Sequence, residues 1–263
     1  MRRFSGDVFA ERIDDLAVEE PLQISCAWPG GEHDLAVTMR TPGHDPELAV
    51  GFMLGEALLD KAAKVRAVHV RDVNRVCVEL QNAPSPDMLE SLERNFYVSS
   101  SCGVCGKASI EAVRLQSGFQ GGQDAFTVTP EVLNKLPDEL MQRQAIFADT
   151  GSIHAAALFS GNGLQADVFE DVGRHNALDK LLGHCFLRGA LPLAECGVFV
   201  SGRASFELVQ KVHMAGVPML VAVGAPSSLA VDFAWESDVT LVGFLREDRF
   251  NVYSAPKRVC DLS

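Results

Sequence analysis

The alternation of strand and helix is clearest in CGVFVSGRASFELVQKVHMAGVPMLVAVG, residues 196–224. Residues 196–200 and residues 218–223 are short apolar runs that predict buried strands, and residues 204–215 between them predict a helix. Strands that are apolar along their whole length are typically buried on both faces of a sheet. The pattern therefore predicts an α/β fold with a mixed or parallel sheet covered by helices.

The segments on either side continue this alternation. Residues 153–160 and 164–170 predict a hairpin, because the GNG between them favours a tight turn. Residues 174–187 predict a helix. Its inward face carries Leu178, Leu181 and Leu182. The other elements predicted near the C-terminus are a helix over residues 228–235, a strand over residues 239–245 and an edge strand over residues 251–253.

The N-terminal half predicts a smaller α/β domain. Residues 18–28 and 32–40 predict two strands of a hairpin, because a proline and two glycines separate them. The polar, glycine-rich residues 118–122 predict a boundary, so we expect domains of residues 1–122 and 123–263. Also predicted are strands over residues 64–71 and 75–81, helices over residues 85–95 and 107–117, and two helical pieces that open at Thr129-Pro130 and Pro137-Asp138.

A further helix is predicted directly after the first hairpin. Asp45 is a ready N-cap, and Pro46 suits the first helical position. Gly51 and Gly55 lie four residues apart and therefore fall on one side of this helix. Two glycines on one side predict close packing against a neighbouring element.

The composition excludes several classes of function. The chain has 263 residues, 47% of them hydrophobic, and a formal net charge of −12. Nucleic-acid binding needs a basic face, so we expect no such partner. The most apolar segment, residues 217–235, is interrupted by prolines and a glycine and cannot span a bilayer as one helix. The N-terminus lacks the apolar run of a signal peptide, and seven cysteines fit reduced thiols, so we expect a cytoplasmic protein without a membrane partner.

Polar clusters follow four of the predicted strands: EDVGRHN at residues 170–176, SGRAS at 201–205, GAPSS at 224–228 and FLREDR at 244–249. In such sheets, ligands lie at the carboxyl ends of strands, where helix N-termini point. Helix caps and turns use the same residue types, and this alternative stays open for each cluster alone. Arg174 and Arg203 favour a ligand, because phosphates attract arginine and caps do not require it. The clusters together predict a nucleotide-like or phosphate-bearing ligand.

Two cysteines lie in the segment SSSCGVCGKASI, residues 99–110. Cys102 and Cys105 are flanked by glycines and preceded by serines, which predicts a mobile CxxC loop (residues 99–107) that does not build a core. Lys107 and the N-terminus of the helix predicted after it favour the thiolate form of both sulfurs. The pattern indicates chemistry on sulfur.

The CxxC motif alone leaves three kinds of site open. A structural zinc site normally needs four ligands, and the other five cysteines are scattered singly, so we expect no zinc. A thioredoxin-type redox pair would follow an early strand of a βαβ unit. The third is a mobile persulfide carrier, in which one thiolate accepts a sulfane sulfur from a donor and hands it on.

Several segments, taken in order, resemble the FdhD family, the sulfur carrier proteins needed for formate dehydrogenase activity. The resemblance extends from about residue 20 to the C-terminus. The matching segments are ELAVGFMLGEALL, CGVCG, TGSIHAAAL, EDVGRHNALDKLLG, SGRASFELVQKVHMAGVP and LVGFLREDRFNVYSAPKR. A zinc deaminase is not expected, because Ser101 rather than proline precedes Cys102 and no His-x-Glu lies upstream.

The resemblance implies a sulfurtransferase-type function. Such a protein accepts persulfide sulfur from an IscS-type cysteine desulfurase and transfers it to the molybdenum cofactor in its bis(guanine dinucleotide) form. The cofactor, of which guanine nucleotides are fragments, is then inserted into formate dehydrogenase. The resemblance also implies a C-terminal fold like that of cytidine deaminases, without their zinc, and a homodimer. A chaperone that binds the cofactor without carrying sulfur is the alternative.

The resemblance also implies roles for individual residues. Cys102 is the expected persulfide carrier, and Cys105 is its partner thiol. The family's cofactor-binding segment falls on Phe244, Leu245, Arg246, Glu247, Asp248 and Arg249. Within it, Phe244 is the candidate for stacking on guanine, and the two acidic residues are expected to contribute backbone contacts. The clusters at strand ends add Ser201, Arg203, Arg174 and His175 to the expected cofactor-binding residues.

Overall fold

The structure is a computed structural model of residues 1–263, and it describes all of them except 6–7, 12, 60–63, 85–118, 120–125 and 261–263. Its elements, in chain order, are β1 (Arg2–Ser5), β2 (Val8–Glu11), β3 (Glu20–Trp28), β4 (Gly31–Arg40), α1 (Asp45–Gly55), β5 (Val65–Asp72), β6 (Arg75–Leu80), α3 (Pro130–Met141), α4 (Ala145–Thr150), β7 (His154–Ser160), β8 (Gly163–Asp171), α5 (Arg174–Leu187), β9 (Gly197–Val200), α6 (Phe206–Met214), β10 (Met219–Ala222), α7 (Ser228–Glu236), β11 (Thr240–Gly243), β12 (Asn251–Ser254) and the 3-10 helix η2 (Pro256–Arg258).

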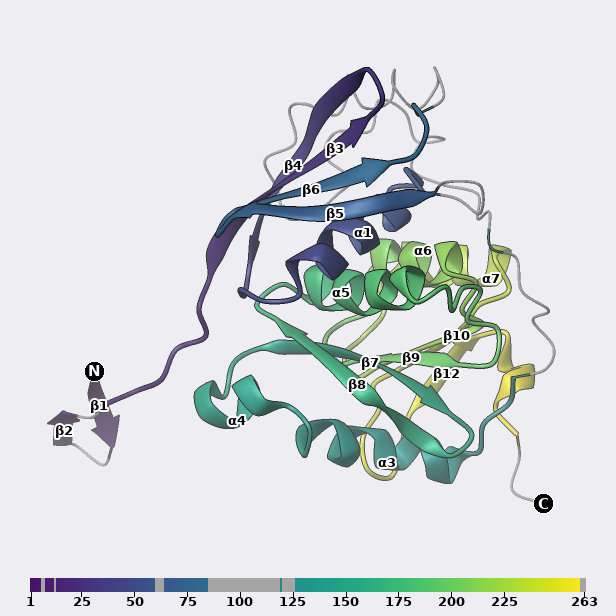
Figure 1. Ribbon diagram of the computed structural model, residues 1–263. Coiled ribbons are helices and arrows are strands. Elements are labelled where there is room, and N and C mark those ends of the chain that lie inside the picture. Colours follow the sequence, from purple (N-terminus) through teal and green to yellow (C-terminus); the bar gives the residue numbers. More distant parts are fainter. Residues whose placement is uncertain (6–7, 12, 60–63, 85–118, 120–125, 261–263) are drawn as a thin grey trace.

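Sheets and helices alternate in layers (Figure 1). A four-stranded sheet, in the order β4-β3-β6-β5, packs on α1, which in turn lies against α5. Helices α5 and α6 cover one face of a six-stranded sheet, and α3 covers the other face. The predicted α/β architecture, a mixed sheet covered by helices with a smaller sheet in the N-terminal half, is confirmed.

The six-stranded sheet has the order β12-β11-β10-β9-β7-β8. Strands β9, β10 and β11 are parallel, whereas β7, β8 and β12 run antiparallel to their neighbours. Val198 and Val200 of β9 face the helices α5 and α6, while Phe199 faces α3. Both faces are buried, which explains why the strands are apolar along their whole length. The predicted edge strand is β12.

The predicted close packing of glycines in α1 is confirmed. A methyl group on Gly51 would lie 1.9 Å from the carbonyl oxygen of Asp179 in α5, and one on Gly183 would lie 1.9 Å from the carbonyl oxygen of Glu47 in α1. The two backbones therefore approach too closely for any side chain at either position. Gly55 also packs closely, because a methyl group on it would lie 2.6 Å from Nζ of Lys211 in α6. This crossing joins the N-terminal half of the chain to the helices of the C-terminal half.

Two predictions about helix ends were wrong. The N-cap position of α1 is His44, which has a left-handed φ of 58° and makes no side-chain capping hydrogen bond, whereas Asp45 is the first residue of the helix and its carboxylate is paired with Arg40. Pro137 does not open a new helix but lies inside α3. One apolar face of α3 is buried on the sheet across the proline, and it carries Leu133, Leu136 and Leu140. The second helical piece, α4, begins at Ala145.

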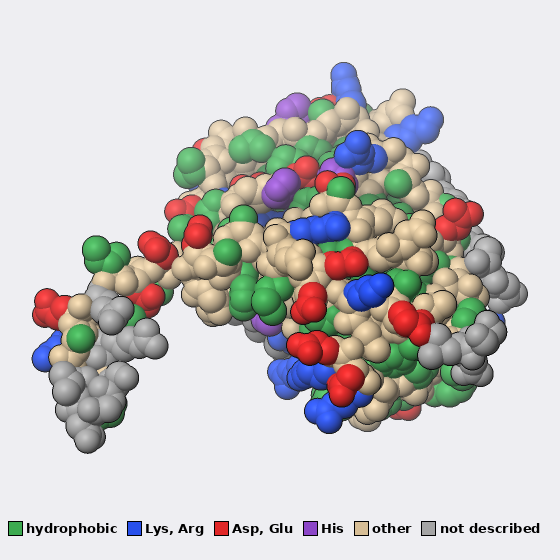
Figure 2. Space-filling view, turned by 90° about the horizontal axis from the view of Figure 1, so that it is seen from below, with side chains coloured by type: hydrophobic (Ala, Val, Ile, Leu, Met, Phe, Trp, Pro, Cys, Tyr) green, Lys and Arg blue, Asp and Glu red, His purple; other side chains and the backbone are tan. Residues whose placement is uncertain are grey.

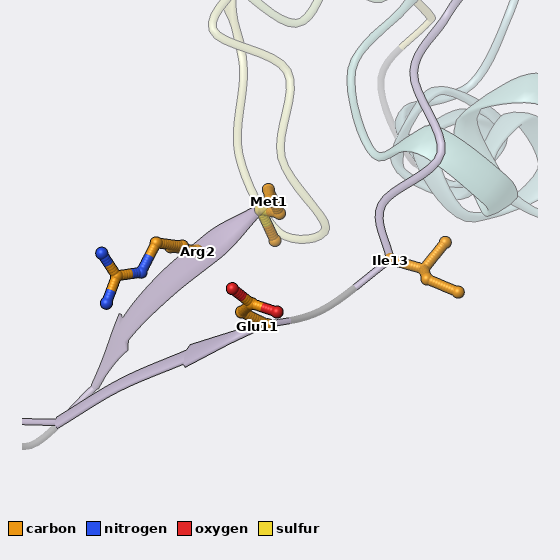
Figure 3. A pocket seen from close by; sticks show the side chains of 4 residues that line it. All are labelled: Met1, Arg2, Glu11 and Ile13. Atoms are coloured by element: carbon orange, nitrogen blue, oxygen red, sulfur yellow. The ribbon is translucent and has the colours of Figure 1, made fainter.

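The N-terminal residues, which showed no motif, form the hairpin β1–β2. This hairpin lies away from the rest of the molecule (Figures 1 and 2). A hollow at the hairpin is lined by Met1, Arg2, Glu11 and Ile13 (Figure 3). The face of the main body seen in Figure 2 carries acidic and basic side chains interspersed.

Several expectations concern residues that the structure does not describe. The helices predicted over residues 85–95 and 107–117, and the CxxC loop between them, lie outside the described residues. The division into domains at residue 122 stays a prediction. No helix within the described ranges is long and apolar enough to cross a membrane.

Candidate functional site

The sheet topology brings the predicted polar clusters to one edge. Because β9, β10 and β11 are parallel, their carboxyl ends lie at the same edge of the six-stranded sheet. Strand β7 is antiparallel to β9, so its first residue lies there too, paired with the last residue of β8. We call residues 171–176, 201–207, 223–227 and 244–249, together with His154, the strand-end edge.

Backbone hydrogen bonds connect neighbouring loops along this edge. The N–H of Ser201 donates to the carbonyl of Ala155 at 3.0 Å, and the Ser201 hydroxyl accepts from the Ala155 N–H at 2.9 Å. The N–H of Gly224 donates to Gly202 at 2.9 Å, and that of Phe244 donates to Gly224 at 3.1 Å. The loops after β9, β10 and β11 are thus linked to one another by hydrogen bonds.

Arginines at the strand-end edge lack acidic partners. No hydrogen bond or ion pair engages the exposed side chains of Arg203 and Arg249 in the described part of the chain. The Nε atom of Arg174 is buried and has no hydrogen-bond partner among those residues. Arg246 uses one guanidinium nitrogen to donate to the carbonyls of Val223 and Leu245, at 2.8 Å each, which holds its head group in place. An anionic ligand would supply the missing partners.

Two histidines lie among these arginines. Nε2 of His175 lies 2.9 Å from a carboxylate oxygen of Glu207 and 3.2 Å from the Ser205 hydroxyl, and so links the first turns of α5 and α6. Burial lowers the pKa of His154, and the neighbouring Arg174 and His175 lower it further, which favours the neutral form of its imidazole. His154 was not among the residues predicted to bind a ligand. The signal available was its place in TGSIHAAAL, at the start of a strand.

A buried network holds the loop that presents Arg174. The carboxylate of Asp171, with none of its side chain exposed, is paired with Lys180 at 2.8 Å. It also accepts the backbone N–H groups of Gly173 at 2.8 Å and Thr41 at 3.1 Å. Because Thr41 follows β4, this network attaches the N-terminal half to the strand-end edge.

Comparison with known proteins identifies the family. A model of the FdhD/NarQ family matches residues 17–260. The chain belongs to the FdhD/NarQ family.

Individual relatives match nearly the whole chain. A protein of Streptomyces avermitilis named sulfur carrier protein FdhD is 46% identical over 268 residues, covering 98% of this chain and 93% of its own. One of the same name from Mycobacterium tuberculosis is 45% identical over 271 residues, covering 98% and 96%. The crystal structure of a candidate formate dehydrogenase accessory protein from Desulfotalea psychrophila has a TM-score of 0.75 and 25% identity, and covers 99% of this chain and 97% of that one.

A weaker likeness covers about half of the chain. A guanine deaminase from Nitrosomonas europaea matches 48% of this chain and 83% of its own, at 16% identity and a TM-score of 0.32. That likeness is too low to carry an argument.

The structure places the segment 244–249 of this FdhD/NarQ protein at the strand-end edge. Phe244 has a left-handed φ of 55° and is 44% exposed, a strained conformation that presents an aromatic ring to solvent. The side chain of Leu245 is fully buried in the core, so its expected contact with the cofactor stays a prediction that only its backbone could fulfil. The side chains of Glu247 and Asp248 are exposed, and the N–H of Arg246 donates to the carbonyl of Arg249 at 2.9 Å, which closes the turn.

The two cysteines implied by the family resemblance, Cys102 and Cys105, lie outside the described residues. Burial raises the pKa of Cys26 and of Cys185 to about 12, so both remain thiols at neutral pH and have structural roles. Among the residues that the structure describes, no group of three or more His, Cys, Asp or Glu side chains is arranged to hold a metal ion.

Proposed function

We propose that this protein is a sulfur carrier that serves a formate dehydrogenase. Cys102 receives sulfane sulfur from an IscS-type cysteine desulfurase and passes it to a molybdenum cofactor held at the strand-end edge. The names of the relatives support the general role. The observation that carries the proposed cargo binding is the set of arginines without acidic partners, in a chain whose net charge is −12.

The strand-end edge suits the guanine dinucleotide part of the cargo. Diphosphates need positive charge, which Arg203, Arg246 and Arg249 supply, and N–H donors, which the first turns of α6 and α7 supply. The exposed ring of Phe244 offers a stacking surface for guanine. The buried pair of Asp171 and Lys180 positions the loop of Arg174 and His175 beside them.

The first chemical step is an exchange between two persulfides. The Cys102 thiolate attacks the terminal sulfur of the desulfurase persulfide, a new S–S bond forms on Cys102, and the desulfurase cysteine leaves as a thiolate. The sulfane sulfur keeps its oxidation state, so this step needs no oxidant or reductant. Lys107 favours the attacking thiolate.

The second step releases the sulfur. The Cys105 thiolate attacks the inner sulfur of the Cys102 persulfide, a Cys102–Cys105 disulfide forms, and hydrosulfide leaves. The two thiols are oxidised by two electrons and the sulfane sulfur is reduced by two, so the step balances. The hydrosulfide is the sulfur delivered to the cofactor, and a cellular dithiol reduces the disulfide before the next cycle. Cytoplasmic location and a homodimer form part of the proposal.

The sulfur-carrier proposal is tested by mass spectrometry after incubation with a cysteine desulfurase and cysteine. Wild-type protein should gain about 32 daltons, one sulfur atom, and Cys102→Ala should not. The same variant should fail to activate formate dehydrogenase. Cys260→Ala, which replaces a partly exposed cysteine outside the CxxC, is the matched control and should retain both properties. A Cys102→Ala variant that still activates formate dehydrogenase would contradict the sulfur-carrier proposal and would favour the alternative, a chaperone that only binds the cofactor.

Cargo binding is tested separately with guanosine diphosphate, a fragment of the cofactor. It should bind in titration calorimetry and raise the melting temperature, because it stabilises the folded state. Replacing Arg246 and Arg249 together by alanine should lower the affinity at least about tenfold, since each charge-assisted hydrogen bond contributes about 1.5–3 kcal/mol. Equal affinity for adenosine diphosphate, unchanged in the double variant, would contradict a guanine site at this edge.

A further inference from the structure

Two side chains at the strand-end edge lie against the same glycine, Gly202. A methyl group on Gly202 would lie 3.4 Å from Nδ1 of His154 and 3.5 Å from Cδ of Arg174. The imidazole comes from the first residue of β7, and the guanidinium from the first residue of α5. Strand pairing and the loop after β9 thus bring together residues that are distant in sequence.

Both side chains have unused hydrogen-bonding groups. Within the described ranges, neither ring nitrogen of His154 has a hydrogen-bond partner, although its side chain is partly buried. The Nε of Arg174 is fully buried and also lacks a partner there. Buried polar groups are rarely left unsatisfied in folded proteins, so the Nε of Arg174 indicates a ligand that is bound in the working state, and the unpartnered ring nitrogens of His154 lie close enough to contact the same ligand.

The charges that surround His154 favour an anion. Arg174 and His175 face it from α5, and Asp171 faces it from the end of β8. The negative charge of Asp171 is matched by its buried partner Lys180 at 2.8 Å. The charges remaining nearby are those of Arg174, of the exposed Arg203 in the loop after β9, and of the His175 pair with Glu207 from α6. The net charge around His154 is therefore positive.

We propose that His154 and Arg174, together with the backbone of Gly202 beside them, form a binding site for a tetrahedral oxyanion of the phosphoryl or sulfate class, and that His154 takes up a proton when the anion binds. The proposed function identifies the natural anion as a phosphoryl group of the cofactor. The anion site rests on the proposed function for this identity only. Arg174 supplies the permanent charge, and His154 makes the affinity depend on pH.

The direction of the pH dependence follows from linkage. In the free protein, burial and the neighbouring cations hold the pKa of His154 below 6.5. A bound anion favours the imidazolium form and therefore raises this pKa. Affinity for the anion should increase as the pH falls through the pKa of the bound state, and should level off below the pKa of the free state.

The test is a titration of the whole protein with sodium sulfate, monitored by the NMR signals of the His154 ring at several pH values. Sulfate does not itself titrate between about pH 5.5 and pH 8, so the pH dependence reports on the protein. Saturating sulfate should raise the pKa of His154, and the affinity should gain about tenfold for each unit of that rise. An unchanged pKa of His154 under saturating sulfate overturns the proposal.

Substitutions test whether sulfate binds at His154 and Arg174. His154→Gln should abolish the pH dependence, and Arg174→Gln should weaken sulfate binding about tenfold. His184→Gln and Arg188→Gln are matched controls, because these side chains contact each other at 3.1 Å near the C-terminal end of the same helix. Both controls should bind sulfate like the wild type. Equal losses in test and control variants would show non-specific binding and overturn the site.

Guanosine diphosphate distinguishes the source of the anion. If it displaces sulfate from His154, the site holds a phosphoryl group of the cofactor, and if both bind together, the site holds a free oxyanion. Either result supports an anion site. If guanosine diphosphate fails to bind while sulfate still raises the pKa of His154, the anion site stands and the proposed cofactor site falls.

Discussion

The four-stranded sheet and the strand-end edge use arginine in opposite ways. In the sheet, Arg40 is buried and makes two hydrogen bonds of 2.9 Å to Asp45. On its exposed strands, Arg71 pairs with Glu32 at 2.8 Å, and Arg66 pairs with Glu79 at 3.0 Å. At the strand-end edge, Arg174, Arg203 and Arg249 have no acidic partner among the residues described.

The difference separates charges that serve the fold from charges that serve a ligand. The chain has 35 acidic and 23 basic residues, so carboxylates are in excess. Clustered arginines without carboxylates repel one another and destabilise the folded state unless an anion binds. Paired arginines connect strands and fix loops. Substitutions in the two regions should therefore affect different properties.

The largest effect is expected for stability at Arg40. Arg40→Met would leave the mostly buried carboxylate of Asp45 without its partner and should lower the free energy of unfolding by about 3 kcal/mol. Arg203→Met, at the exposed strand-end edge, should change it by less than about 0.5 kcal/mol. Urea denaturation measures both. Similar losses in the two variants would remove the distinction between the regions.

A smaller effect is expected for ligand affinity at Arg203. Arg203→Gln should weaken guanosine diphosphate binding about tenfold, because one charge-assisted contact to a phosphate is lost. Arg66 is exposed like Arg203 but is already paired with Glu79. The Arg66→Gln variant should therefore bind guanosine diphosphate with the affinity of the wild type. Calorimetry at fixed salt concentration makes the comparison. A loss of affinity in Arg66→Gln as large as that in Arg203→Gln would indicate general electrostatic attraction.

The smallest effect concerns acid stability of the four-stranded sheet. The hydrogen bond from Arg71 holds the pKa of Glu32 below its ordinary value of 4.5. Its contribution to stability is therefore fully present above pH 4.5 and is lost as the pH falls through the lower pKa of the folded state. Because both side chains are well exposed, Glu32→Gln should lower stability at pH 7 by less than about 1 kcal/mol.

The acid-stability prediction has a control at the strand-end edge. Denaturation of Glu32→Gln at several pH values should show its difference from the wild type disappearing in acid. Glu247→Gln removes an exposed carboxylate that no ion pair engages within the described ranges, and it should leave the acid limb of the stability curve unchanged. A difference for Glu32→Gln that persists in strong acid would show that the pair does not act through its charge.

The order of residues alone was enough to predict most elements of the C-terminal half. Apolar runs and helical spacing are local signals, and β7 to β12 lie close to their predicted ranges. The four polar clusters were likewise visible, because each directly follows a strand. The close approach at Gly51 was predicted from helical spacing alone, although its partner Asp179 was not.

The tertiary structure decided which of these residues act together. Strand order and direction, which no local pattern encodes, place His154 beside Arg174 and Gly202 and assign the side chain of Leu245 to the core. Likewise, whether an arginine is paired depends on carboxylates from other elements: Glu32 for Arg71, and none for Arg203. The charge at each position could be predicted from the residue type. Whether that charge is free to bind a ligand depends on contacts with residues that are distant in the sequence.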